Sequence, residues 1–418
     1  MKEGFVLTQK KAITGKGLAW LLTLIYFTSY VTRINFSAII QAVIIDTGFE
    51  KAKLSIILVL LSATYGLGQI VNGRLGDVFN PTNLIFSGLI ITTVANLMFP
   101  LASSSIALMA VLWAINGFAQ AMMWPPIVKI LVSKCDEAQY TYAMIRVSWG
   151  SSFGTILVYL TAPSIISLFG WEGVMYASAI LGGAVAIIWF FLKSRITNDY
   201  SVGVINSTPN HNKLSIPSVS IVPLVFIALG IIFQGMLKDG ITSWTPTYLS
   251  EVFNYDASDS IFYTLALAVF SIVCYTLVGE AYKRFMKNEV LGASLLFALA
   301  VVSCGVLFAF FNVAGGILTV AMLSIITGLM HGINLMLVSY VPKRFKIYGN
   351  ISTISGLLNS CSYIGSAIFT YAVAVLSEHL KWRYTVGVWG IVAALGAVVC
   401  LIAGILWRKF IDINKESN

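Results

Sequence analysis

The chain has 418 residues, of which 58% are hydrophobic and only 10% are charged. Soluble proteins carry about 25% charged residues, so this chain has too few charges to cover a water-facing surface. The composition therefore excludes a soluble enzyme, a nucleic-acid-binding protein and a disordered scaffold, and it predicts a protein of the lipid bilayer. The five cysteines are odd in number. They predict neither disulfides nor a metal site.

Hydrophobic runs predict twelve membrane-spanning helices, since a helix needs about 20 apolar residues to cross a bilayer. In chain order they are expected near 18–44, 54–73, 82–102, 105–132, 139–168, 172–192, 220–250, 259–281, 289–311, 315–341, 349–377 and 384–407. The polar, turn-rich stretch 193–218 separates the first six from the last six and predicts a linker. We therefore expect an all-α membrane protein with a six-helix bundle at 1–192, a cytoplasmic linker at 193–218 and a second bundle at 219–418.

The placement of basic residues predicts the orientation in the membrane. With the N-terminus in the cytoplasm, eighteen Lys and Arg residues fall in cytoplasmic segments and four in external loops, at Lys51, Lys53, Lys381 and Arg383. This is the positive-inside pattern, with both termini in the cytoplasm of a cell (inner or plasma) membrane. Topology thus accounts for the net charge of +9, and no nucleic acid is needed as a partner.

The two halves also carry an internal repeat. At an offset of 211 residues, Gly117, Gly154 and Trp171 recur as Gly328, Gly365 and Trp382. The end of the second span, Gly73–Phe79, is echoed by Gly279–Phe285 at the end of the eighth. Two pseudo-symmetric six-helix repeats with a site between them are typical of the major facilitator architecture. The Gly73–Phe79 segment resembles that superfamily's loop motif, so we expect Gly73, Arg74 and Asp77 to serve gating.

Four basic residues lie inside the predicted spans: Arg33, Lys129, Arg146 and Lys238. A charge at the bilayer centre costs about 2.5–3.5 kcal/mol on insertion scales, so each needs a reason to be there. Lys129 and Arg146 lie one or two turns from the cytoplasmic ends of spans 4 and 5. They either reach the lipid phosphates with their long side chains or hold a cytoplasmic gate shut.

Arg33 and Lys238 lie mid-span on spans 1 and 7, which are equivalent in the two repeats, and each is on a polar stripe with helical spacing. Either each cation pairs with a buried carboxylate or the two bind an anionic substrate. Asp239 is the next residue after Lys238 and is directed about 100° away on a helix. Glu280 is at the cytoplasmic end of span 8. Neither is expected to neutralise both cations, which favours an anion held by the Arg fork and the Lys point charge.

Further polar residues of the spans are candidates for the same cavity, or else hydrogen-bond between helices. For His331, packing and proton coupling are the two alternatives. The candidates are Tyr30, Tyr65, Gln69, Asn116, Gln120, Trp149, His331, Asn334, Asn359 and Tyr363.

Three segments resemble the organophosphate:phosphate antiporter family, the glycerol-phosphate and hexose-phosphate exchangers. Tyr30–Phe36 is similar to that family's Tyr-x-x-Arg-x-Asn-Phe. Gly117–Lys129 is similar to its Gly-x-x-Gln-Gly-x-x-Trp-Pro-Pro-x-x-Arg, and Lys238–Leu249 to its Arg-x-Gly-x-x-x-Trp-x-Pro-x-Tyr-Leu. The resemblance implies that Arg33 and Lys238 are the paired cations for a substrate phosphate.

The chain departs from the family at three places. Lys238 replaces an Arg, Gln69 stands where the family commonly has Lys, and span 5 lacks the His-Asn pair of the glycerol-phosphate members. Fewer positive groups make a sulfonate, a carboxylate or a singly charged phosphate ester plausible as cargo.

We therefore expect a secondary transporter, not an enzyme, without a cofactor or metal, and acting as a monomer. Its cargo is expected to be a small organic anion, first of all a sugar- or polyol-phosphate exchanged for inorganic phosphate by alternating access. A proton-coupled symporter of an acidic or sulfonated sugar and a non-transporting sensor of a sugar phosphate are the alternatives.

Overall fold

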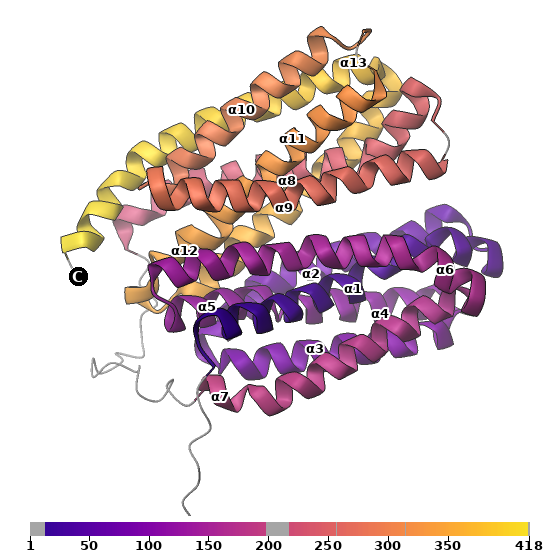
Figure 1. The fold of residues 1–418 in the computed structure, drawn as a ribbon, viewed down its shortest axis with the longest axis horizontal. Helices are drawn as coiled ribbons and strands as arrows, with labels where there is room; N and C mark the ends of the chain where they lie inside the picture. Colours follow the sequence, from indigo (N-terminus) through magenta and orange to yellow (C-terminus); the bar gives the residue numbers. More distant parts are fainter. Residues whose placement is uncertain (1–12, 198–216, 256, 314, 417–418) are drawn as a thin grey trace, which may run out of the picture.

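The computed structural model describes residues 13–197, 217–255, 257–313 and 315–416, and within these ranges every regular element is a helix (Figure 1). The first half of the chain forms α1 (Gly15–Thr47), α2 (Lys51–Val78), α3 (Pro81–Met98), η1 (Pro100–Ala102), α4 (Ile106–Gln120), α5 (Trp124–Lys134), α6 (Glu137–Leu192) and α7 (Ser194–Thr197). The second half forms α8 (Ser218–Phe253), α9 (Ala257–Phe285), α10 (Glu289–Ala309), α11 (Gly316–Asn334), η2 (Leu335–Tyr340), α12 (Val341–Lys343), η3 (Lys346–Tyr348) and α13 (Ile351–Glu416).

The helices are arranged as two bundles that lie against each other along their length. In Figure 1 the helices of the first half, indigo to magenta, form the lower bundle, and those of the second half, orange to yellow, form the upper one. The end of the molecule where α1 begins, α6 ends and α13 ends is called the linker end here, and the opposite end the far end.

The described helices cross a bilayer twelve times, as the sequence predicts. Eleven stretches are long and apolar enough to do so, and one of them is the 56-residue α6. Gly170 has a φ of 71° inside α6 and reverses the chain there, so α6 supplies two crossings. Lys381, with a φ of 64°, similarly divides α13. Both reversals fall in the predicted breaks, 168–172 and 377–384.

Two predicted spans are interrupted rather than continuous. Span 105–132 is divided between α4 and α5, because Pro125 and Pro126 have no N–H to donate and sit where a new helix begins. Span 315–341 passes into the π-helix η2 just before Pro342. The carbonyl of Val338, four residues before this proline, instead accepts a hydrogen bond from Ser355 Oγ at 3.3 Å. Such π segments are frequent at functional sites.

The internal repeat is visible in helix packing. Gly154 packs so closely on α1 that a Cβ there would lie 2.8 Å from the carbonyl oxygen of Phe27. Gly365, its counterpart, has the same relation to Ile232 on α8, where a Cβ would clash with the carbonyl oxygen. The two contacts explain why glycine recurs at this offset: each lets an inner helix approach the helix that carries Arg33 or Lys238.

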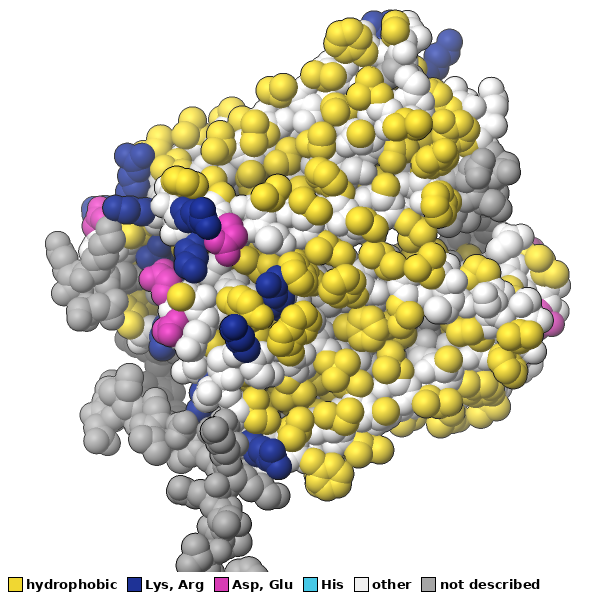
Figure 2. Space-filling view, in the orientation of Figure 1, with side chains coloured by type: hydrophobic (Ala, Val, Ile, Leu, Met, Phe, Trp, Pro, Cys, Tyr) yellow, Lys and Arg dark blue, Asp and Glu magenta, His cyan; other side chains and the backbone are white. Residues whose placement is uncertain are grey.

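The surface separates apolar flanks from a charged end. Figure 2 shows hydrophobic side chains over both bundles and most Lys, Arg, Asp and Glu side chains gathered at the linker end. Exposed Leu, Ile, Val and Phe residues on nearly every long helix account for the flanks. Such a surface is suited to lipid along the helices and to water at the charged end.

Candidate functional site

A small closed cavity lies between the two bundles. Its volume is about 20 Å³, roughly room for one water molecule. Both halves of the chain line it, through Tyr26, Tyr30, Trp124, Ser148, Lys238, Tyr275, His331, Asn334, Asn359 and Tyr363. Six of the predicted site residues are therefore brought together here: Tyr30, Lys238, His331, Asn334, Asn359 and Tyr363.

Arg33 lies beside this cavity, surrounded by rings and a hydroxyl. Its side chain comes from α1 and only 7% of the residue is exposed. One terminal nitrogen, Nη1, donates to the hydroxyl of Tyr363 at 3.2 Å. The guanidinium carbon is 4.2 Å from the ring centre of Tyr30 and 4.8 Å from that of Tyr65. No carboxylate of the described residues forms an ion pair with Arg33, so its charge is only softened by ring faces.

Lys238, in contrast, has a carboxylate partner, and the expectation that it stays unpaired is wrong. Its Nζ is 3.4 Å from Oδ1 of Asp239, with 12% and 31% of the two side chains exposed. The long lysine side chain bends back across the helix surface and so reaches a neighbour that starts about 100° away. Glu280, the other candidate, pairs with Arg284 at 3.8 Å. The site therefore holds one unneutralised cation and one ion pair.

His331 contributes a polar contact on the second-half side of the cavity. Its Nδ1 lies 2.8 Å from the hydroxyl of Tyr275 on α9. Tyr275 and Ser148 were not among the predicted site residues. The repeat contained the signal for both, because Ser148 is the counterpart of Asn359 at the offset of 211, and Tyr275 corresponds to Gln69 at the offset of 206 that relates Gly73 to Gly279.

Tyr65 and Gln69, one turn apart on α2, do not line the cavity, and Tyr65 lies beside it against Arg33 and Tyr363. The ring of Tyr65 is 4.5 Å from that of Tyr363, centre to centre, so the two halves meet there. Gln69 is fully buried, and neither its amide nitrogen nor its amide oxygen has a hydrogen-bond partner among the described residues. A buried amide without partners is costly, which leaves Gln69 able to bind a polar group that enters.

Gln120 and Trp149 lie outside the cavity lining and have other partners. The amide of Gln120 accepts from Ser29 at 2.5 Å and donates to Thr32 at 2.9 Å and to Thr92 at 3.1 Å. These bonds join α1, α3 and α4 within the first bundle, which agrees with the alternative of a structural interhelical role. Trp149 Nε1 donates across the bundles to Thr276 Oγ1 at 3.2 Å. Asn116 belongs to the Gln120 network, through Thr92 at 2.6 Å.

At the linker end the bundles are held together by the predicted loop motif. The carboxylate of Asp77, on α2, accepts the N–H groups of Ser352 at 3.0 Å and Thr353 at 2.7 Å, at the start of α13. An anion at a helix N-terminus is stabilised by the helix dipole as well as by these bonds. Lys129 donates to the carbonyls of Gly76 at 2.8 Å and Asp77 at 3.1 Å. Lys129 thus fixes the Asp77 turn.

The remaining motif residues divide into contact and surface positions. At Gly73 a Cβ would lie 2.9 Å from the carbonyl oxygen of Ser352, so glycine is what allows α2 and α13 to touch. Arg74 is exposed. Arg146 stacks on rings of its own helix, 3.8 Å from Trp149 and 4.8 Å from Tyr142, and among the described residues it makes no hydrogen bond or ion pair with the second bundle. Here the described structure gives Arg146 no gating contact.

A second set of contacts closes the same end beside the first. Tyr140 donates to the carbonyl of Ser339 at 2.5 Å, and Lys343 pairs with Glu137 at 3.1 Å. One apolar cluster runs through both bundles, whereas the cluster around Phe36, Trp113 and Trp171 belongs to the first bundle alone. The two bundles are thus joined at the linker end. The apolar cluster around Phe36, Trp113 and Trp171 takes no part in that junction.

Comparison with known proteins places this geometry in a family. The model of the Major Facilitator Superfamily matches residues 22–370. The glycerol-3-phosphate transporter of Bacillus subtilis (strain 168) is 27% identical over 389 residues, covering 86% of this chain and 85% of that protein. A probable hexose phosphate transport protein of Chlamydia pneumoniae is 35% identical over 156 residues, 37% of this chain and 34% of that one.

Solved structures agree on the fold. A bacterial homologue of the iron transporter ferroportin, in an outward-facing state, superposes with a TM-score of 0.72 at 10% identity, covering 94% of this chain and 99% of that one. The transporter FucP, in the outward conformation, gives 0.68 at 15% identity, with 94% and 98% covered. At these identities the likeness extends to the arrangement of helices and no further.

Proposed function

Because the chain belongs to the Major Facilitator Superfamily and is a multi-pass secondary transporter, we propose that its cargo is a small organic anion, first of all a sugar- or polyol-phosphate. One observation carries the proposal. Arg33 is buried beside a cavity shared by both halves, and no described carboxylate neutralises it. A desolvated guanidinium with free donors binds an oxyanion strongly. Two relatives, named as a glycerol-3-phosphate transporter and a probable hexose phosphate transport protein, support the same class of cargo.

The charge of the site favours a singly charged group. Arg33 contributes one positive charge, while Lys238 and Asp239 offset each other at 3.4 Å. A dianionic phosphate would remain undercompensated, whereas a monoanionic phosphate ester, a sulfonate or a carboxylate would balance Arg33. Gln69, neutral and without partners, adds a hydrogen bond but no charge. We therefore rank monoanionic forms first.

Exchange for inorganic phosphate is the coupling that we propose. Returning the empty site through the closed, low-dielectric state would carry the uncompensated charge of Arg33 with it, which raises the barrier without cargo. Proton symport is the second candidate, and the Lys238–Asp239 pair favours it. A proton on Asp239 would release Lys238 to the anion, so that proton and anion would bind together. A sensor that binds without transport is the third reading.

In this proposal the halves 1–192 and 219–418 rock about the cavity, with both termini in the cytoplasm of the cell membrane. Closure by Asp77 and Tyr140 at the linker end then corresponds to a state closed toward the cytoplasm. Opening toward the other side requires breaking the contacts of Tyr363 with Arg33 and Tyr65, which bridge the bundles beside the cavity.

Flux through purified protein tests the proposal. Proteoliposomes loaded with inorganic phosphate are given labelled glycerol 3-phosphate, sugar phosphates, sugar sulfonates and sugar acids in turn, with and without a pH gradient. Exchange predicts uptake that needs internal phosphate. Uptake into empty vesicles driven by the pH gradient would replace exchange with symport, and binding without flux would establish the sensor. Transport of neutral sugars alone would refute the assignment of an anion-binding site.

A further inference from the structure

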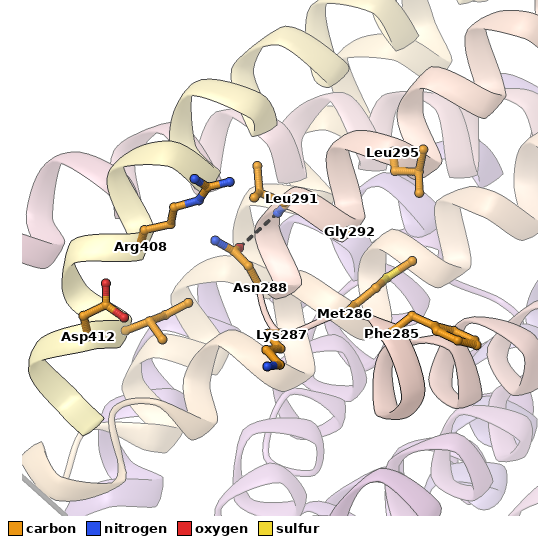
Figure 3. A pocket seen from close by; sticks show the side chains of 10 residues that line it. Phe285, Met286, Lys287, Asn288, Leu291, Gly292, Leu295, Arg408 and Asp412 are labelled. Carbon is orange, nitrogen blue, oxygen red and sulfur yellow. Dashed lines mark hydrogen bonds between the residues drawn. The ribbon is translucent and has the colours of Figure 1, made fainter. Parts of the chain in front are cut away.

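A second and larger cavity lies at the linker end of the second bundle, away from the central site. Its volume is about 540 Å³, and it lies between the end of α9, the start of α10 and the last turns of α13 (Figure 3). Its lining includes Phe285, of which 80% is exposed. The cavity therefore opens outward at the rim of the bundle, where the apolar flank meets the charged end.

Two cations with no described partner stand at this cavity. Arg408, on α13, extends toward Leu291 at the start of α10 (Figure 3). Lys287 precedes α10, and among the described residues neither its Nζ nor the guanidinium of Arg408 has an ion pair or hydrogen bond. Arg344, close by, differs, because it pairs with the buried Glu289 at 3.1 Å. Asp412 is the one acidic residue of the lining, so two positive charges face one negative charge.

The start of α10 does not take up the charges of Lys287 and Arg408. Asn288 accepts the N–H groups of Val290 at 3.0 Å and Leu291 at 3.1 Å, which caps the helix with its own side chain. Its amide nitrogen donates to the carbonyl of Gly404 at 2.9 Å and so ties α10 to α13. The walls of the cavity are therefore fixed, while the charges of Arg408 and Lys287 are left for a ligand.

Apolar stripes lead from the cavity along both walls. On α10, Leu295, Leu299 and Val302 are 52%, 47% and 62% exposed, at a spacing that keeps them on one side of the helix. On α13, Leu401 and Ile405 are 48% and 55% exposed and lie on the same helix side as Arg408. A ligand that matches this surface has an anionic head at the cations and a hydrocarbon tail along the stripes.

We propose that this cavity binds an anionic phospholipid, with its phosphate between Lys287 and Arg408 and an acyl chain along α10 and α13. Basic pockets between membrane helices, next to the headgroup layer, bind anionic lipids. A free phosphate would satisfy the cations but would leave the exposed leucines and valines uncovered. All of the lining residues belong to the second bundle, so the lipid stays bound while the halves move.

The test measures binding of phosphatidylglycerol and of zwitterionic phosphatidylcholine to the purified full chain, by native mass spectrometry in detergent. Phosphatidylglycerol is expected to bind and phosphatidylcholine to bind much more weakly. The double variant K287A/R408A should weaken phosphatidylglycerol binding by about fivefold for each cation removed. K409A, which removes the exposed basic residue next to Arg408, is the matched control and should bind as the wild type does.

Two further arms identify the ligand. Leu295→Gln should weaken phosphatidylglycerol binding, because it makes the tail path polar without changing the cations. Excess soluble glycerol phosphate should fail to displace the lipid. Equal binding of the two lipids, or wild-type binding by K287A/R408A, would overturn the proposal. Full displacement by glycerol phosphate with an unaffected Leu295→Gln variant would instead show a site for free anions. Melting temperatures near the wild-type value confirm that the variants are folded.

Discussion

Replacing Arg33 by Gln removes the one charge on which the anion site depends. Gln retains hydrogen-bonding capacity and is smaller than Arg, so the loss reports mainly on charge. Hydrogen bonds to ionised groups are worth about 1.5–3 kcal/mol, and the 7% exposure of Arg33 leaves little solvent screening. We therefore expect Arg33→Gln to weaken anion binding by about 10- to 150-fold. Arg33→Lys, which keeps the charge but loses the planar fork, should lose less.

The assay is calorimetric titration of purified protein with the tightest-binding member of a panel of phosphorylated, sulfonated and carboxylated sugars and polyols. Lys409→Gln is the control, because it removes an exposed basic residue at the linker end and should leave the Kd unchanged. A melting temperature near that of the wild type shows that Arg33→Gln is folded despite the lost bond to Tyr363. Wild-type affinity in folded Arg33→Gln would make this arginine structural and would refute the site.

Three more substitutions separate the parts of the proposal. Gln69→Lys should improve binding of dianionic phosphates relative to monoanionic sulfonates, measured as a ratio of Kd values; an unchanged ratio would show that Gln69 does not face the substrate. Asp77→Asn should shift the protein at least about tenfold away from the linker-end-closed state, measured by hydrogen exchange at the start of α13, since it weakens two charge-assisted bonds. Asp136→Asn, which changes a cap inside one bundle, is its control and should not shift that equilibrium. His331→Gln should retain most phosphate exchange, whereas pH-driven uptake lost in this variant would establish proton coupling through His331.

The sequence predicts the fold well because each membrane span and each chain reversal is indicated by its own local stretch of residues. Long apolar runs and chain reversals such as Gly170 depend on local composition and backbone geometry, so they could be located within a few residues. The interruptions at Pro125 and in η2 were missed. An apolar run looks the same whether the helix inside it is continuous or broken, and proline alone does not say which way the chain turns.

The candidate site was harder to predict, because partners are set by distance in space. The helical spacing of polar residues predicts that Tyr30 and Lys238 face the same cavity, and both line it. Gln120, four residues after the polar Asn116 on its own span, uses its amide inside the first bundle, and no spacing rule distinguishes the two cases. For Lys238, helix geometry placed Asp239 on a different side, but side-chain length outweighed the 100° between them. The correction changes the expected charge of the cargo.

Tyr363 links the binding of an anion to movement of the halves. It belongs to the second bundle, yet its hydroxyl accepts from Arg33 and its ring packs on Tyr65, both of the first. An anion that takes the Nη1 donor of Arg33 competes with this bond directly. A ligand shifts a conformational equilibrium only by its difference in affinity for the two states. Because Arg33 donates to the opposite bundle beside the closed cavity, the anion must gain more in a state where Tyr363 is displaced or turned. Tyr363→Phe removes the hydroxyl that accepts from Arg33. The variant should therefore bind the anion more strongly and populate the closed state less. A merely structural tyrosine would not produce these two effects together.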